Sequence, residues 1–120
     1  MNIDFRKAVF TLVLTLSLSF AASAHAILVK STPAANETLT DHNVPVALTF
    51  NSKVDQARST LTLEGPDHLT SKLEIHVDPS SASKLTAEVQ KLAPGSYKLR
   101  WQVLAVDGHI TRGEINFNVK

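Results

Sequence analysis

Apolar and polar residues alternate with a period of two along most of the chain beyond residue 25, which is typical of strands that bury one face. In the longest run, residues 97–103, Tyr97, Leu99, Trp101 and Val103 alternate with polar side chains. Shorter alternating sets and one apolar segment complete the pattern, at residues 26–30, 46–50, 61–63, 73–77, 85–89 and 115–119. The pattern predicts about seven strands and no long helix after residue 24.

Turn-forming residues separate these runs. Clusters of Pro, Gly, Asn, Asp and Ser lie at residues 33–36, 41–43, 65–67, 78–80 and 94–95. Short strands with regular turns are typical of two packed antiparallel sheets with Greek-key connections. The sequence therefore predicts an all-β fold, a Greek-key β-sandwich or barrel.

The first 24 residues have the three parts of an export signal. Arg6 and Lys7 end a short head, Ala8–Phe20 is uncharged and apolar, and Ala22-Ser23-Ala24 supplies the small residues that signal peptidase reads. A membrane-spanning helix needs about 20 apolar residues, so this stretch is short for an anchor. We interpret residues 1–24 as a cleaved signal peptide and residues 25–120 as the single mature domain. A retained anchor or an N-terminal helix of the fold are the alternatives.

Composition narrows the classes of function. The chain has 120 residues, 12 basic and 11 acidic. Removal of a leader that contains Asp4, Arg6 and Lys7 leaves the two counts equal, which argues against nucleic acid or an anionic membrane as partner. The chain has no Cys, and its one Met is Met1. A mature domain without sulfur excludes disulfides, thiol catalysis and thiolate or thioether metal sites, and export without Cys suggests the periplasm.

The candidate chemistry lies in His25, Asp107 and His109. Cleavage after Ala24 would leave His25 as the first residue, with an α-amine of ordinary pKa about 7.7–8.0 beside an imidazole of ordinary pKa about 6.5. Both groups are neutral nitrogen donors near neutral pH and can chelate one metal ion. In Asp107-Gly108-His109, an extended backbone puts a carboxylate and an imidazole on the same side. If the first strand begins at the end of the sandwich that holds this loop, His25 lies next to it.

Each of these features also has a plainer interpretation. Asp-Gly is the commonest pair in hairpin turns, and an N-terminal His is usually exposed and unpaired. Three nitrogens and a carboxylate suit a tetragonal Cu(II) ion, although Zn(II) accepts the same ligands in a tetrahedron. Without sulfur ligands we expect no separate Cu(I) site. All donors must lose their protons, so acid should weaken binding.

The mature chain resembles the CopC family of periplasmic copper-binding proteins. The resemblance rests on residues spread over nearly all of the mature domain: His25-Ala26, residues 31–34, Leu48-Thr49-Phe50, residues 94–97 with Trp101 and Val103, and Asp107-Gly108-His109. It implies an immunoglobulin-like or cupredoxin-like fold and a role in copper homeostasis or resistance. It also implies one Cu(II) ion per chain, held by the amine and imidazole of His25, by Asp107 and by His109. Some family members bind Cu(I) through a Met-rich loop, which this chain lacks.

The resemblance further suggests a CopD-like inner-membrane copper transporter as partner. We therefore expect a binding protein and no enzyme, with no membrane insertion once the leader is removed. Two alternatives stay open: a metal-free β-sandwich interaction module, and a copper oxidative enzyme with an N-terminal histidine brace. The other histidines, His42, His68 and His76, are expected to be solvated, and Trp101 to lie in the core. Arg112 is a candidate for orienting Asp107.

Overall fold

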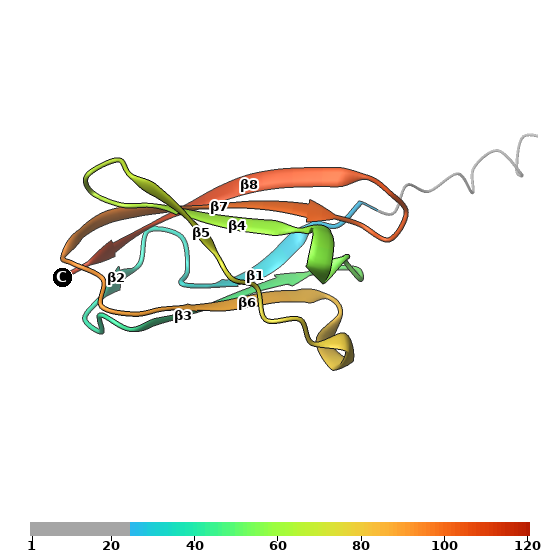
Figure 1. The fold of residues 1–120 in the computed structure, drawn as a ribbon, viewed down its shortest axis with the longest axis horizontal. Helices are drawn as coiled ribbons and strands as arrows, with labels where there is room; N and C mark the ends of the chain where they lie inside the picture. The colour runs from blue at the N-terminus through green and yellow to red at the C-terminus, as the bar shows by residue number, and fades with distance from the viewer. Residues whose placement is uncertain (1–24) are drawn as a thin grey trace, which may run out of the picture.

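The computed structural model describes residues 25–120, which form eight strands and two short 3-10 helices in two packed sheets (Figure 1). The predicted leader, residues 1–24, lies outside the described residues. One sheet has three strands in the order β1 (Leu28–Thr32), β3 (Val44–Phe50) and β6 (Lys84–Val89). The other has five, in the order β2 (Thr38–Leu39), β8 (Ile110–Val119), β7 (Gly95–Leu104), β4 (Thr60–Glu64) and β5 (Thr70–Leu73). The 3-10 helices are η1 (Gln56–Arg58) and η2 (Pro79–Ser81).

The predicted all-β sandwich is confirmed, and among the described residues the two sheets do not close into a barrel. All strand pairs are antiparallel except β2 with β8, which run parallel. The longest ladder joins β7 to β8 without a break, from Gly95 opposite Val119 to Leu104 opposite Ile110. Within residues 25–120 no helix has the length and apolar character needed to cross a bilayer.

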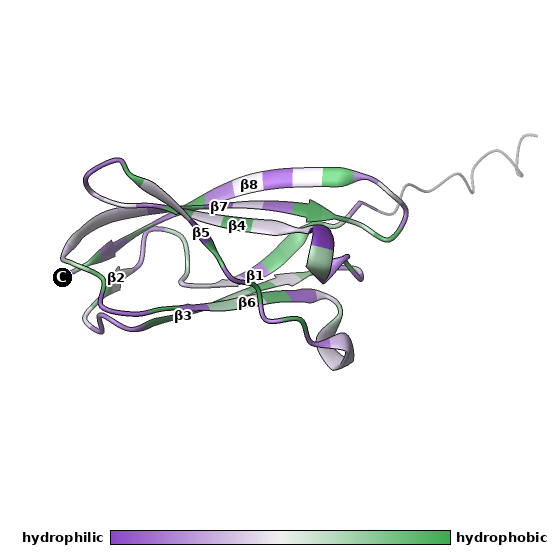
Figure 2. Ribbon diagram, viewed as in Figure 1, coloured by the Kyte–Doolittle hydropathy of each residue, from purple (hydrophilic) through white to green (hydrophobic). Residues whose placement is uncertain are grey.

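The core lies between the inner faces of the two sheets. Leu48 and Leu85 of the three-stranded sheet and Leu61, Leu99 and Phe117 of the five-stranded sheet are 0–1% exposed. Burial of each such side chain contributes about 1.5–3 kcal/mol to folding. Hydrophilic, purple bands alternate with pale bands along β8 in Figure 2, and more buried residues alternate with exposed ones along most of this strand, as expected where one face is buried and one is solvated.

One predicted strand is wrong. The alternation at residues 73–77 predicts a continuous strand, but β5 ends at Leu73. The next residues cross from the five-stranded sheet to the three-stranded sheet, because β5 and β6 belong to different sheets. Ile75 still packs against the core, whereas Val77 is 53% exposed. The His76 N–H donates to the carbonyl of Thr86 in β6.

The strand directions bring three segments to one end of the sandwich, which we call the site end. There β7 stops at Leu104, β8 starts at Ile110, and the described chain begins at His25 (Figure 1). β1 and β8 therefore start at the same end, which is the condition for His25 to reach the loop between β7 and β8. The opposite end, called the far end, holds the turns that lead into β3 and β7 and the turn that follows β4.

Candidate metal centre

The loop between β7 and β8, residues 105–109, is a closed turn. The Ala105 N–H donates to the carbonyl of His109 at 2.8 Å, and the Gly108 N–H donates to the carbonyl of Ala105 at 2.9 Å. Gly108 has a φ of +91°, a value that side chains with a Cβ rarely adopt, and it has nothing near its Cα that a side chain would meet. Asp107 and His109 therefore project from a short loop whose backbone is fixed.

Asp107 binds His109 twice. Its Oδ1 accepts a hydrogen bond from the main-chain N–H of His109 at 3.1 Å, and its Oδ2 lies 3.0 Å from His109 Nδ1. The main-chain bond, followed by the side-chain contact, holds the pKa of the Asp107 carboxyl below its ordinary value of 3.8. The carboxyl is thus ionised at neutral pH, and Nε2 of His109 is the ring nitrogen that this contact leaves available.

His25 lies against His109, although the two residues belong to opposite ends of the described part of the chain. The ring centroids are 4.7 Å apart and the rings meet edge to face at 77°. The next residue, Ala26, is only 1% exposed, and its carbonyl accepts a hydrogen bond from Thr111 Oγ1 at 2.9 Å. Chain ends commonly fray unless they are tied down. Here a buried side chain and a bond to β8 hold the residue next to His25.

A second side chain fastens the same segment from the other sheet. Asn51, directly after β3, accepts a hydrogen bond from the Ile27 N–H on its Oδ1 at 2.8 Å, and its own N–H donates to the Ile27 carbonyl at 2.9 Å. Neither Asn51 nor Thr111 was predicted from the sequence. A signal was present for Thr111, which lies two residues after His109 and thus has the same strand parity. No comparable signal marked Asn51, whose partner is 24 residues away.

The structure brings the rings of His25 and His109 into contact, and Asp107 binds His109. Within residues 25–120, however, no group of three or more His, Cys, Asp or Glu side chains has the arrangement of a metal-binding cluster. The oxygens of Asp107 are committed to His109, and the His25 nitrogen is a peptide nitrogen in the full chain. These side chains are neighbours that would have to turn toward a common point to hold one ion.

The other residues that the sequence singled out lie mostly away from this cluster. His42, His68 and His76 are exposed, as predicted, and Nδ1 of His42 lies 2.6 Å from the carbonyl of Leu92. Trp101 is in the core as predicted, at 9% exposed. The suggested role of Arg112 is not supported, because its Nε donates to Gln102 Oε1 at 2.8 Å on the outer face of the sheet.

The chain as a whole is similar to known proteins in sequence and in fold. Residues 28–120 match the CopC domain family, a range that includes Asp107 and His109 and begins just after His25. Protein YobA of Escherichia coli K12 is 33% identical over 99 residues, covering 81% of this chain and 80% of that protein. Copper resistance protein C of Xanthomonas campestris pv. juglandis is 30% identical over 125 residues, covering 97% of this chain and 98% of that protein. The crystal structure of CopC from Methylosinus trichosporium OB3b superposes with a TM-score of 0.73 at 28% identity, covering 80% of this chain and 94% of that one.

Proposed function

This chain belongs to the CopC family of copper resistance proteins, and on that premise we propose that it is an exported carrier of one Cu(II) ion. The family consists of copper-binding proteins rather than enzymes. The proposed ligands are the α-amine and imidazole of His25, the carboxylate of Asp107 and the imidazole of His109. The proposed location is the periplasm, where the protein would buffer copper or pass it to a CopD-like inner-membrane transporter.

One observation carries the proposal: the imidazole rings of His25 and His109 lie 4.7 Å apart. The two residues come from segments distant in sequence, which Ala26 and Thr111 join through a hydrogen bond between residues 85 positions apart. If residues 107–109 were only a solvated turn and His25 only an unpaired terminal residue, their side chains would not need to be in contact. Two imidazoles beside an ionised carboxylate form the donor set that a divalent first-row metal prefers when sulfur is lacking.

Export would complete the donor set. In the full chain the main-chain nitrogen of His25 is part of the peptide bond to Ala24 and has no basic lone pair. Cleavage between these residues would turn it into an amine on the same residue as an imidazole, so that both close a chelate ring on one ion. Three nitrogens and one oxygen then suit the tetragonal geometry of Cu(II), the tightest-binding ion of the divalent series.

Metal entry requires Asp107 to exchange one partner. Its Oδ2 would leave His109 Nδ1 for the metal, while Oδ1 can keep its bond to the main-chain N–H. The turn would therefore persist when the site fills. The side chains of Asp107 and His109 are 28% and 58% exposed, so an ion from solution or from a partner can reach them without opening the fold.

The test is a Cu(II) titration of purified mature protein whose N-terminus is verified by mass spectrometry. We expect saturable one-to-one binding, a nitrogen-rich tetragonal electron paramagnetic resonance spectrum, and weaker binding of Zn(II). Trp101 emission provides a second readout, since bound Cu(II) commonly quenches nearby indoles. A matched pair of variants carries one additional residue, either before His25 or after Lys120.

The residue before His25 moves the amine away from the imidazole, so the affinity should fall at least about 100-fold, beyond the losses typical of outer-shell changes. The residue after Lys120 lies at the far end and should leave the affinity unchanged. Equal affinity in both extended forms would show that the amine is not a ligand. Failure of the mature protein to bind Cu(II) saturably would instead favour a metal-free interaction module.

A further inference from the structure

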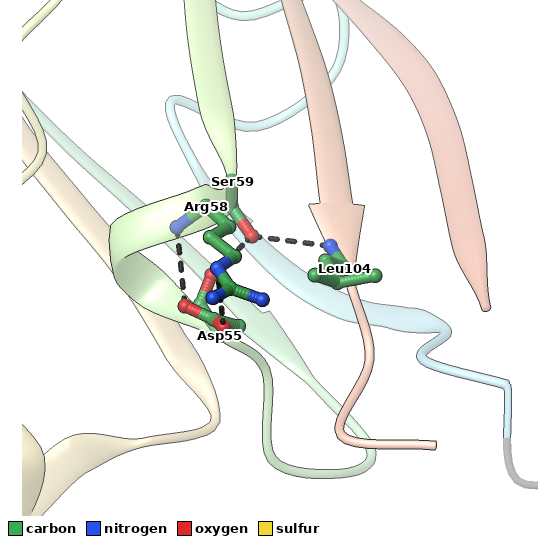
Figure 3. A network of polar contacts seen from close by, with 4 residues as sticks. All are labelled: Asp55, Arg58, Ser59 and Leu104. Carbon is green, nitrogen blue, oxygen red and sulfur yellow. Dashed lines mark hydrogen bonds and ion pairs between the residues drawn. The ribbon is translucent and has the colours of Figure 1, made fainter. Parts of the chain in front are cut away.

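The base of the loop that carries Asp107 and His109 is bound on two sides. On one side β8 pairs with β7 up to Leu104. On the other side lies the segment that contains η1, and Figure 3 shows the contact between Ser59 of this segment and Leu104. There the Leu104 N–H donates to Ser59 Oγ at 3.2 Å, and the Leu104 carbonyl accepts from the Asp55 N–H at 2.8 Å. Both main-chain groups of the last β7 residue are thus held from outside the β7–β8 ladder.

These contacts replace a strand pairing that ends early. β4 pairs with β7 from Thr60, which lies opposite Gln102, so an extended ladder would place Arg58 opposite Leu104. Arg58 belongs to η1, however, and turns away from β7. An unpaired main-chain group beside a buried core is costly. The Ser59 hydroxyl acts as the acceptor that the next residue of a continued strand would have supplied.

Ser59 is suited to this task because it is buried and its hydroxyl is bonded on both sides. It is 5% exposed, and its Oγ–H donates to the Asp55 carbonyl at 2.6 Å (Figure 3), which turns the oxygen lone pairs toward the Leu104 N–H. Asp55 in turn caps η1, since its Oδ1 accepts from the Arg58 N–H at 3.1 Å. At such a buried position, solvent does not readily replace a lost hydroxyl.

The fastening continues directly into the loop. Ala105, the residue after Leu104, forms an isolated bridge with Val54, while its N–H and carbonyl bind His109 and Gly108. On the other side of η1, Gln56 Nε2 donates to the carbonyls of Ser81 and Lys84 at 2.8 and 2.9 Å. The loop is therefore tied through η1 to η2 and to the first residue of β6 in the opposite sheet.

From these contacts we propose that Ser59 is a positioning residue for the metal-binding loop. It fixes Leu104 and Ala105, and through them the direction in which Asp107 and His109 project toward His25. The role rests on the proposed function, because it concerns how well that site holds Cu(II). Ser59 itself does not touch the metal.

The test compares Ser59→Ala with Ser96→Ala in the mature protein. Ser96 lies at the far end of β7, the strand that ends at Leu104, and donates from its hydroxyl to Asn118 Oδ1 at 2.8 Å. We expect Ser59→Ala to raise the Cu(II) dissociation constant about three- to tenfold, within the roughly 2- to 30-fold effects of residues that act through intervening structure. Its paramagnetic resonance parameters should also shift, whereas Ser96→Ala should change neither. Both are measured well below the melting temperature of each variant.

A purely structural Ser59 would lower the melting temperature yet leave the dissociation constant and the spectrum of the folded protein unchanged. That result, with wild-type protein still binding Cu(II), would overturn the positioning role and leave the proposed function intact. If Ser59→Ala does not fold, Asp55→Ala decides. It removes the cap of η1 and the exposed ion pair of Asp55 with Arg58 but keeps the main-chain groups of Asp55, so it should weaken binding in the same direction by a smaller factor. Wild-type protein that binds no Cu(II) would overturn the proposed function and this role together.

Discussion

The two ends of the sandwich contain the same kind of aspartate turn in different surroundings. At four places an Asp Oδ1 accepts a hydrogen bond from the main-chain N–H two residues later, at 3.0–3.1 Å; the aspartates are Asp41, Asp67, Asp78 and Asp107. This local bond stabilises a turn wherever it occurs. The turn by itself therefore says nothing about metal binding, and the difference between the ends must come from what surrounds it.

Of these four aspartates, Asp107 alone has a histidine two residues later, and there a second histidine comes alongside. At the far end, His42 directly follows Asp41, and its Nδ1 lies at the carbonyl of Leu92 instead. Neighbours in an extended chain point to opposite sides, so an Asp-His pair separates its donors where Asp-x-His brings them together. The comparison shows that spacing and a third segment, rather than residue type, distinguish a candidate site from a turn.

The largest effect on Cu(II) affinity should come from removing a histidine at the site end, and removal of a histidine at the far end should have no effect. His109→Ala deletes a proposed ligand, so we expect the Cu(II) affinity to fall at least about 100-fold, more than outer-shell losses. His42→Ala is its match, because it removes an exposed histidine that also contacts a main-chain carbonyl. Competition titration against a chelator of known affinity measures both. Comparable losses in the two variants would mean that copper binds elsewhere.

A smaller loss should follow from neutralising one aspartate turn. Asn can accept the same turn hydrogen bond as Asp, so Asp107→Asn and Asp67→Asn both keep the backbone of their turns. Only Asp107→Asn removes a carboxylate from the proposed metal site. We expect about a 10- to 100-fold weaker Cu(II) affinity for Asp107→Asn, whether the carboxylate binds the ion or orients His109. Asp67→Asn should bind as the wild type does. An unchanged affinity for Asp107→Asn would remove Asp107 from the site.

Much of the fold follows from the sequence because alternation is a local property. The runs around Leu48, Leu85, Leu99 and Phe117 became strands whose apolar residues face the core. The run at residues 73–77 did not, since the crossing between sheets is decided by tertiary connection and not by residue parity. The two-residue strand β2 is too short to leave a pattern.

The candidate site was predictable in its chemistry but not in its support. Asp107 and His109 are recognisable by their spacing, and His25 by its place after small residues. Asn51 and Ser59 act through single hydrogen bonds to main-chain groups 24 and 45 residues away. Such pairings depend on how the sheets pack. An Asn directly after a strand or a Ser directly before one is too common in sequences to be recognised as a support of the site.

A still smaller effect should come from loosening the N-terminal segment. Thr111→Val keeps the shape of the side chain and removes the hydroxyl that donates to the Ala26 carbonyl. One such bond contributes about 1 kcal/mol. Without it, ordering the N-terminal segment when the ion binds would cost that free energy, which corresponds to about a fivefold change in affinity. We expect a Cu(II) affinity lower by that factor, measured by titration. Thr62→Val, a half-buried threonine in β4, is the control and should bind normally.

The smallest effect concerns protonation of the metal-free protein, and it separates the turn from the histidine pair. Because the pKa of Asp107 is lowered, its contribution to folding stability is present above the ordinary value of 3.8 and is lost as the pH falls through the lowered value. Carbon NMR of the carboxylates should therefore give Asp107 a midpoint below 3.8. In His109→Ala the main-chain bond from residue 109 remains, so the pKa should rise only part of the way back.

Asp78 provides the internal reference for this titration. Hydrogen bonds from the side chain and main chain of Ser80 lower its pKa, and neither bond involves His25 or residues 105–109. Its midpoint should therefore be the same in wild type and His109→Ala, while that of Asp107 moves upward. A full return of Asp107 to 3.8 would mean that the His109 side chain, and not the turn, lowers the pKa of this carboxyl. The turn at Asp107 would then differ in kind from the turn at Asp78, and not only in its neighbours.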